Sequence, residues 1–134
     1  MTLIDTNILL DLVTDSPDWY EWSLARLDDA ALAGRLLIND IVYAETSIRY
    51  DRIEDLDAML AGTMIQIAPT PRSALFLAGK AYRRYRAAGG TRTGVLPDFF
   101  IGAHAAVEGW PLLTRDTSRY RTYFPNITLI APAT

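Results

Sequence analysis

Four acidic residues are spaced so that their side chains could act together. Asp5 ends a predicted strand, and Asp116 lies two residues after Thr114, which ends a later one. Asp98 begins a predicted helix, whereas Glu45 lies inside another on a partly apolar face, where a carboxylate needs a partner. Carboxylates that converge repel one another unless a cation lies between them. A set of oxygen ligands without cysteine or a nearby histidine favours Mg²⁺ or Mn²⁺ over Zn²⁺.

Each acid also has an ordinary structural explanation. Asp5 and Asp116 could be capping or turn residues, and Asp98 could stabilise a helix N-terminus through the helix dipole. Glu45 could pair with Arg49, one helical turn further along. Residue types and spacing therefore leave two interpretations open: an acidic site for a hard metal ion, or acids that serve the local structure.

The elements that would position these acids alternate along the chain. Short apolar segments predict strands, and segments with capping residues, helical periodicity and terminal glycines predict helices. The predicted strands cover residues 2–5, 36–38, 64–67, 111–114 and 127–130, and the predicted helices cover residues 8–12, 16–34, 39–49, 53–60, 70–88 and 97–109, with a turn or short helix at 116–123. This alternation predicts an α/β fold, a parallel-sheet α/β/α sandwich with helices on both faces. Ligands of such sheets collect beyond the carboxyl ends of the strands, where the strand order reverses.

Composition limits the class of protein. The chain has 134 residues, of which 50% are hydrophobic and 22% charged, so we expect a single domain, residues 1–134, with its own core. The absence of cysteine excludes a disulfide scaffold, thiol catalysis and cysteine metal sites, and it agrees with a reducing compartment. Because the sequence shows neither a signal peptide nor a long apolar run, we expect a cytoplasmic protein without a membrane segment.

The formal net charge of −3 hides an uneven distribution. Residues 1–67 hold 13 acids and 4 arginines, whereas residues 68–134 hold 3 acids, 8 arginines and Lys80. One interpretation is a domain with an acidic site and a basic rim, which could hold a polyanion against a metal ion. The other is a solvated surface whose two halves neutralise each other.

Longer motifs around the acids carry a specific resemblance. They are Leu3-Ile4-Asp5-Thr6-Asn7, Tyr43-Ala44-Glu45, the run from Leu96 to Ala105 that contains Pro97-Asp98, and Leu112-Leu113-Thr114-Arg115-Asp116. In order and spacing the chain resembles the PIN domain family, and in particular the VapC ribonuclease toxins of bacterial type II toxin–antitoxin pairs. The segment 119–125 is similar to a subset of these toxins, and the resemblance covers essentially the whole chain.

The resemblance implies a metal-dependent endoribonuclease whose catalytic and metal-binding residues are Asp5, Glu45, Asp98 and Asp116. It implies that Asp5 and Asp98 are direct ligands of Mg²⁺ or Mn²⁺. Glu45 and Asp116 would be ligands, water-bridged ligands or the general base. Residues Thr114 and Asn7 would support the site by hydrogen bonding, although a hydroxyl or amide at a strand end is often only a cap.

The same resemblance implies binding partners. A cognate VapB-like antitoxin would lay a segment across the site and place an arginine among the acids. An RNA would be the substrate, and a homodimer is expected. Apolar helices that bear Trp19, Trp22 and Tyr43 could supply the dimer surface.

Basic residues near the acids are candidate contacts to RNA phosphates. They are Arg92, before Asp98, and Arg115 and Arg119, which flank Asp116. The arginines at positions 83, 84 and 86 fit a solvated helix face instead.

The aromatic residues and the only histidine have less specific roles. Tyr120 and Tyr123 could be core residues or platforms on which bases stack. His104 is predicted to be a buried packing residue, because it lies well beyond Asp98 on the same predicted helix.

Three rival functions stay open at the level of sequence. A Mg²⁺-dependent phosphohydrolase of another α/β family, such as a receiver or a haloacid-dehalogenase-like domain, would also place an aspartate after the first strand. Against it, Asn7 stands where a dehalogenase-like motif has a second aspartate, and Lys80 is the only lysine. A non-catalytic PIN-type module that binds RNA or protein would not need four mutually repelling acids. A DNA nuclease on the same fold is the third rival, and the sequence does not tell which RNA a ribonuclease would cleave.

Overall fold

The computed structural model describes residues 1–92 and 94–133 and contains one parallel sheet. Its strands are β1 (Thr2–Ile4), β2 (Leu36–Ile38), β3 (Ile65–Ile67), β4 (Leu112–Leu113) and β5 (Leu129–Ile130). They lie in the order β3-β2-β1-β4-β5, and every neighbouring pair is parallel. The sheet confirms the predicted α/β fold.

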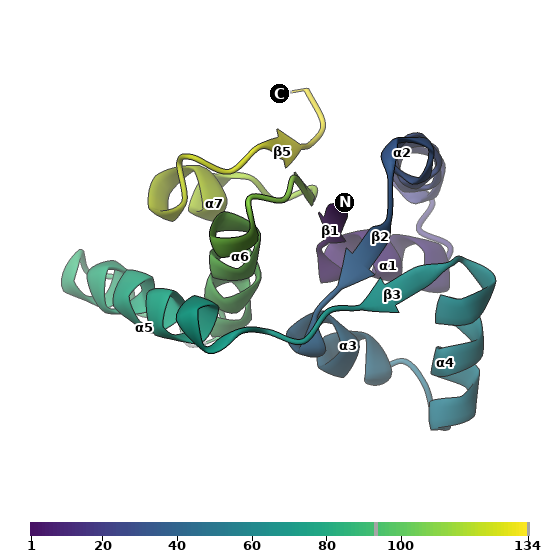
Figure 1. Ribbon diagram of the computed structural model, residues 1–134, viewed down its shortest axis with the longest axis horizontal. Coiled ribbons are helices and arrows are strands. Elements are labelled where there is room, and N and C mark those ends of the chain that lie inside the picture. The colour runs from purple at the N-terminus through teal and green to yellow at the C-terminus, as the bar shows by residue number, and fades with distance from the viewer. Residues whose placement is uncertain (93, 134) are drawn as a thin grey trace.

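Helices cover both sides of this sheet. They are α1 (Thr6–Val13), α2 (Tyr20–Ala33), α3 (Asp40–Ser47), α4 (Ile53–Gly62), α5 (Arg72–Ala87), α6 (Leu96–Glu108) and α7 (Ser118–Tyr123). Figure 1 shows α1, α2 and α4 on one side of the strands and α5, α6 and α7 on the other. Within the described residues, no helix combines the length and the apolar character needed to cross a membrane.

The strand order reverses beside β1. Leu3 of β1 pairs with Leu37 of β2 on one side and with Leu112 of β4 on the other. The chain first builds β2 and β3 outward from β1, and then returns past β1 to add β4 and β5. The carboxyl ends of β1 and β4 therefore delimit the crevice in which open α/β sheets bind their ligands.

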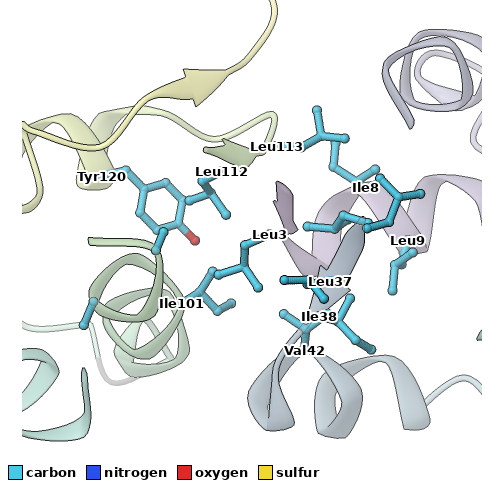
Figure 2. Close-up of a cluster of buried hydrophobic side chains, with 14 of the residues drawn as sticks. Leu3, Ile8, Leu9, Leu37, Ile38, Val42, Ile101, Leu112, Leu113 and Tyr120 are labelled. Carbon is cyan, nitrogen blue, oxygen red and sulfur yellow. The ribbon is translucent and has the colours of Figure 1, made fainter. Parts of the chain in front are cut away.

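The core lies on both faces of the central strands. Leu3, Ile4 and Leu112 are each 0% exposed, as expected for parallel strands covered by helices on both faces. Figure 2 shows Ile101 of α6 on one side of Leu3 and Ile8 of α1 on the other. This packing fixes the ends of β1 and β4, and hence the backbone that carries Asp5 and Asp116.

Some element ends differ from the sequence prediction. The second helix, predicted from Ser16, begins at Tyr20, because Asp15 adopts a left-handed φ of 50° and the Ser16 amide donates to the Asp11 carbonyl oxygen at 2.9 Å. Strand β4 is shorter than the predicted segment 111–114, because its pairing with both neighbours is limited to two residues.

Candidate functional site

Asp5 lies at the end of β1 and at the N-terminus of α1, where its side chain caps the helix. The Thr6 amide donates to Asp5 Oδ1 at 2.7 Å, and the hydroxyls of Thr114 and Tyr120 donate to Oδ2, each at 2.8 Å. The residue is only 4% exposed. Burial raises the pKa of Asp5, and the hydrogen bonds from Tyr120, Thr114 and Thr6 oppose this rise. The carboxylate is therefore held in one orientation by several donors.

Both predicted supporting residues lie against Asp5. The Asn7 amide nitrogen is 3.4 Å from Asp5 Oδ2 and 3.3 Å from the Thr114 hydroxyl oxygen. The Asn7 side-chain oxygen accepts from the Arg115 amide at 3.2 Å, and Thr114 accepts from the Asp116 amide at 3.1 Å. These bonds tie the loop after β4 to the start of α1, so the two strand ends hold each other in place.

Glu45 projects from α3 toward the N-terminus of α1. The Thr6 hydroxyl donates to Glu45 Oε1 at 2.6 Å, which supplies the partner that a half-buried carboxylate requires. Burial raises the pKa of Glu45, the hydrogen bond from Thr6 lowers it, and the negative charge of Asp98 raises it further. The predicted apolar face around Glu45 is only partly buried, since Ile48, three residues further along, is 81% exposed. In the described part of the chain, no ion pair joins Glu45 to Arg49.

Asp98 lies in the first turn of α6 and is paired with an arginine of its own chain. Arg119 Nη1 lies 2.6 Å from Asp98 Oδ2. Burial raises the pKa of Asp98 to about 6, with contributions from the negative charges of Asp5 and Asp116, whereas Arg119 lowers it. One arginine is therefore not enough to offset the burial of this carboxylate and the negative charges beside it.

The acids come from separate segments yet act on one another electrostatically. The charge of Glu45 raises the pKa of Asp5, the charge of Asp98 raises that of Glu45, and Asp116 acts in the same way on Asp98. Asp116 is exposed in the loop between β4 and α7. All four sequence-predicted acids thus lie around the crevice where the strand order reverses.

The donor set suits a hard divalent cation. Every candidate ligand is a carboxylate oxygen, which Mg²⁺ and Mn²⁺ prefer, and the excess negative charge would be relieved by a cation. The side chains are engaged with other donors, Asp98 with Arg119 and Glu45 with Thr6. Accordingly, within residues 1–92 and 94–133 no three such side chains are gathered closely enough to hold a metal ion as they stand. An ion bound through Asp98 Oδ2 would have to displace Arg119.

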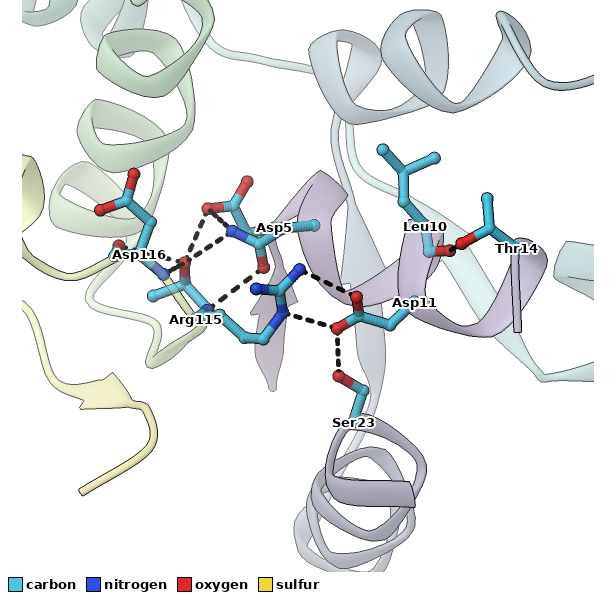
Figure 3. Close-up of polar contacts among 9 residues, drawn as sticks. Asp5, Leu10, Asp11, Thr14, Ser23, Arg115 and Asp116 are labelled. Carbon is cyan, nitrogen blue, oxygen red and sulfur yellow. Dashed lines mark hydrogen bonds and ion pairs between the residues drawn. The ribbon is translucent and has the colours of Figure 1, made fainter. Parts of the chain in front are cut away.

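Arg115, a predicted phosphate contact, is directed toward Asp11 of α1 (Figure 3). Its Nε and Nη2 atoms lie 2.7 Å and 2.9 Å from the two carboxylate oxygens of Asp11. The Ser23 hydroxyl donates to the same carboxylate at 2.6 Å, and the guanidinium lies 4.9 Å from the ring centroid of Trp19. The pair joins α1, α2 and the loop that carries Asp116, which gives Arg115 a structural role beside the site.

The other two predicted phosphate contacts differ in exposure. Arg92 is exposed, and its amide donates to the Tyr85 hydroxyl at 3.2 Å. The side chain of Arg119 is only 15% exposed, and its guanidinium lies 5.8 Å from the Tyr85 ring centroid. Arg92 therefore lies on the surface, whereas Arg119 belongs to the acidic site.

His104 and Tyr120 are both buried. His104 is 1% exposed and its Nδ1 lies 3.3 Å from the Asn39 amide nitrogen, which confirms a buried packing residue. Tyr120 is also 1% exposed, which confirms the interpretation as a core residue and excludes a platform on which bases stack. No sequence pattern indicates the hydrogen bond from Tyr120 to Asp5, although a buried tyrosine hydroxyl generally requires a partner. The contact between Thr6 and Glu45 was missed as well, because it depends on how α1 and α3 pack.

Comparisons with known proteins show which folds this chain resembles. One chain in the structure of VapBC2 from Rickettsia felis bound to a DNA fragment from its promoter superposes with a TM-score of 0.74 at 20% identity, covering 98% of both chains. A chain of DNA-bound VapBC from Salmonella typhimurium gives 0.69 at 17% identity, covering 97% of this chain and 96% of that one. A chain of FitAcB from Neisseria gonorrhoeae gives 0.67 at 19% identity, with the same coverage of 97% and 96%.

At these identities the structural neighbours show the fold. A comparison with curated protein sequences gave no match. The family model of the PIN domain matches residues 2–125, nearly the whole chain. The protein therefore belongs to the PIN domain family.

Proposed function

We propose that this protein is a metal-dependent endoribonuclease that acts as the toxin of a type II toxin–antitoxin pair. The observation that carries the proposal is the meeting of Asp5, Glu45, Asp98 and Asp116 at the strand-order reversal, where the charge of Glu45 raises the pKa of Asp5, the charge of Asp98 raises that of Glu45, and the charges of Asp5 and Asp116 raise that of Asp98. A phosphodiester is itself an anion, so an acidic crevice would repel it without a cation. Metal binding is therefore a requirement of the proposal.

Asp5 and Asp98 are the proposed direct ligands of Mg²⁺ or Mn²⁺. When bound, such an ion would lower the pKa of a water molecule and stabilise charge on the leaving oxygen. Asp5 is already oriented by Thr114 and Tyr120, whereas Asp98 shares its Oδ2 with Arg119. We assign Glu45 and Asp116 to the same site as further ligands or as proton acceptors for the attacking water.

RNA is the proposed substrate, and the basic second half of the chain supplies its contacts. The exposed Arg92 is the first proposed phosphate contact. Arg119 becomes a second one if metal binding releases it from Asp98. Arg115 would contact a phosphate only by giving up its two bonds to Asp11.

An antitoxin is the proposed protein partner. The similar chains come from VapBC and FitAB complexes, and a further one comes from a toxin–antitoxin complex of Klebsiella pneumoniae. An antitoxin arginine that reaches the acidic crevice would meet the same carboxylates that Arg119 now contacts. A homodimer is the proposed assembly of the toxin itself.

The test is to incubate the antitoxin-free protein with total cellular RNA in Mg²⁺, in Mn²⁺ and in EDTA, and to map new RNA ends. Asp98→Asn removes one proposed ligand, and Asp29→Asn, on the exposed face of α2, is the matched control. Discrete cuts that need the metal, persist in Asp29→Asn and vanish in Asp98→Asn would support the proposal. Folded wild-type protein that binds RNA without cutting it would instead favour a non-catalytic binding module, and cuts only in DNA would favour a DNA nuclease.

A further inference from the structure

Helix α7 contacts the acidic site through two consecutive residues. Arg119 pairs with Asp98, and the hydroxyl of Tyr120 donates to Asp5 Oδ2 at 2.8 Å. The Tyr120 side chain is fully enclosed, since the residue is 1% exposed. Its hydroxyl therefore cannot donate to water, and it donates to a carboxylate rather than to a backbone carbonyl.

Close packing against α6 holds this tyrosine in place. A Cβ atom built on Gly102 of α6 would come within 3.0 Å of Tyr120 Cδ1 and within 2.5 Å of Phe124 Cδ2. The glycine thus lets the two rings approach the α6 backbone more closely than any side chain would allow. The position of the Tyr120 hydroxyl is set by this packing, independently of Asp5.

The two oxygens of Asp5 are not equivalent. Oδ2 lies within hydrogen-bond distance of Tyr120, Thr114 and Asn7, whereas Oδ1 accepts only from the Thr6 amide among the described residues. Hydroxyl donors to a carboxylate form short, charge-assisted bonds that fix the plane of the acceptor. The donors on Oδ2 therefore leave Oδ1 as the oxygen with unused acceptor capacity.

We propose that Tyr120 is a positioning residue that orients Asp5 for metal binding, by holding Oδ2 and leaving Oδ1 directed to the ion. This inference rests on the proposed metal-dependent function of the same site. Partners that orient a metal ligand in this way typically change metal affinity or activity by about 10- to 100-fold when they are removed. Tyr120 acts through Asp5 and does not itself touch substrate or metal.

The test is Tyr120→Phe, which removes the hydroxyl and keeps the ring. Tyr123→Phe is the matched control, because Tyr123 lies on the same helix and packs on Phe99, while its hydroxyl makes no hydrogen bond within the described residues. The affinity of each purified protein for Mn²⁺ alone is measured by calorimetric titration, and folding is checked by thermal unfolding. We expect Tyr120→Phe to bind Mn²⁺ about tenfold more weakly than wild type, and Tyr123→Phe to match wild type.

A double-mutant cycle separates positioning from packing. In an Asp5→Asn background the loss of the Tyr120 hydroxyl should have no further effect on Mn²⁺ affinity, because the carboxylate that it orients is gone. Equal Mn²⁺ affinities for Tyr120→Phe and Tyr123→Phe would overturn the inference and leave the proposed function intact. Weakened Mn²⁺ binding by Tyr120→Phe in a protein that cuts no RNA would support the inference and overturn the nuclease.

A spectroscopic measurement covers the case in which Tyr120→Phe does not fold. Fluorotyrosine at position 120 keeps the ring and the hydroxyl, and its fluorine resonance reports the partner of that hydroxyl. Asp5→Asn should shift this resonance and leave that of fluorotyrosine at position 123 unchanged. If Asp5→Asn left the fluorine resonance at position 120 unchanged, the inference would be overturned.

Discussion

The carboxylate of Asp98 is held between a cation of its own chain and the acids around it. Arg119 lies 2.6 Å away, and yet the pKa of Asp98 is raised to about 6, with burial as the largest cause. Asp98 Oδ2, one of the two oxygens that could bind a divalent ion, is thus the one that contacts the guanidinium. Arg119 is both a competitor of the metal and the group that keeps Asp98 ionised.

This double role predicts a pH-dependent effect of Arg119→Gln. At about pH 8, where Asp98 is ionised in both proteins, the variant should bind Mn²⁺ several-fold more tightly because the competing cation is gone. The gain should shrink below about pH 6, because removal of Arg119 raises the pKa of Asp98 further and protons then compete with the ion. Titrations with Mn²⁺ at both pH values test this, with the exposed Arg121→Gln as control. If Arg119→Gln bound Mn²⁺ no more tightly than wild type at the higher pH, opening the Asp98–Arg119 ion pair would cost no binding free energy.

The raised pKa of Asp98 also predicts how the metal-free protein responds to pH. The folded-state pKa of about 6 lies above the ordinary value of 3.8 for this group, so folding disfavours the charged form. Stability is therefore lost as the pH rises through this interval, by at most about 3 kcal/mol.

Asp98→Asn, which mimics the protonated acid, should unfold at a higher temperature than wild type at about pH 7.5 and at nearly the same temperature at about pH 4. Thermal unfolding in EDTA measures the difference. A variant that is less stable at the higher pH would mean that the bond to Arg119 outweighs the burial of charge.

At the scale of elements, the contact between α6 and α7 depends on the small size of Gly102. A Cβ atom there would lie 2.5 Å from the Phe124 ring, a distance that requires the ring to move. Gly102→Ala should therefore destabilise the protein by about 1 to 3 kcal/mol, as overpacked sites do. It should also weaken Mn²⁺ binding, because Tyr120 moves with the same helix.

Gly79→Ala is the matched control for this change. Gly79 lies inside α5, and a Cβ atom there would meet nothing within 4 Å. This substitution should raise stability by up to about 1 kcal/mol, because alanine favours the helix. Chemical denaturation of the two variants compares them directly, and equal effects would argue against tight packing at Gly102.

Helices α3 and α6, which carry Glu45 and Asp98, are joined by a buried polar contact. Asn39 caps α3 by accepting from the Ile41 and Val42 amides, and its amide nitrogen lies 3.3 Å from His104 Nδ1 on α6. The amide can donate only to an unprotonated Nδ1, so the contact requires the neutral ring.

Burial lowers the pKa of His104 below the ordinary value of 6.5 for histidine, while the charges of Glu108 and Asp40 oppose the shift. The unfolded chain therefore takes up a proton before the folded one does, and the contribution of His104 to stability falls as the pH drops below 6.5. His104→Asn should lower the unfolding temperature at about pH 7.5 and lose less stability than wild type on acidification to about pH 5.5. A variant with the same acid sensitivity as wild type would assign that sensitivity to other groups.

The elements were predictable from sequence, whereas the contacts between them were not. Apolar runs of strand length, such as Leu36 to Ile38, and caps such as Asn39 are local signals, and the predicted strands and helices form where these signals occur. The site acids could be proposed because Asp5 and Asp116 follow strands whose carboxyl ends share one edge. No local sequence pattern predicts the hydrogen bond from the Tyr120 hydroxyl to Asp5, because the two residues are 115 positions apart in the sequence.

At the scale of the whole molecule, metal binding should stabilise the entire fold. Asp5 directly precedes α1, Glu45 lies on α3 and Asp98 lies on α6. An ion held between these three side chains would therefore link the three helices. Because such an ion binds the folded chain preferentially, Mn²⁺ at about 100 times its dissociation constant should add about 2.7 kcal/mol to the free energy of unfolding. Thermal unfolding with and without Mn²⁺ measures this effect. Asp98→Asn should show a much smaller effect, and an equal one would place the ion elsewhere.

The pairing of the first strand with the fourth also has a consequence for synthesis on the ribosome. Leu3 of β1 has Leu112 of β4 as its neighbour, and Asp116, Arg119 and Tyr120 follow β4 in the chain. While translation proceeds, β1 has no partner on this side and Asp5 has neither Thr114 nor Tyr120 beside it. A partly made chain therefore holds an incomplete acidic cluster. Whatever chemistry the cluster performs can therefore begin only after β4 and α7 have left the exit tunnel.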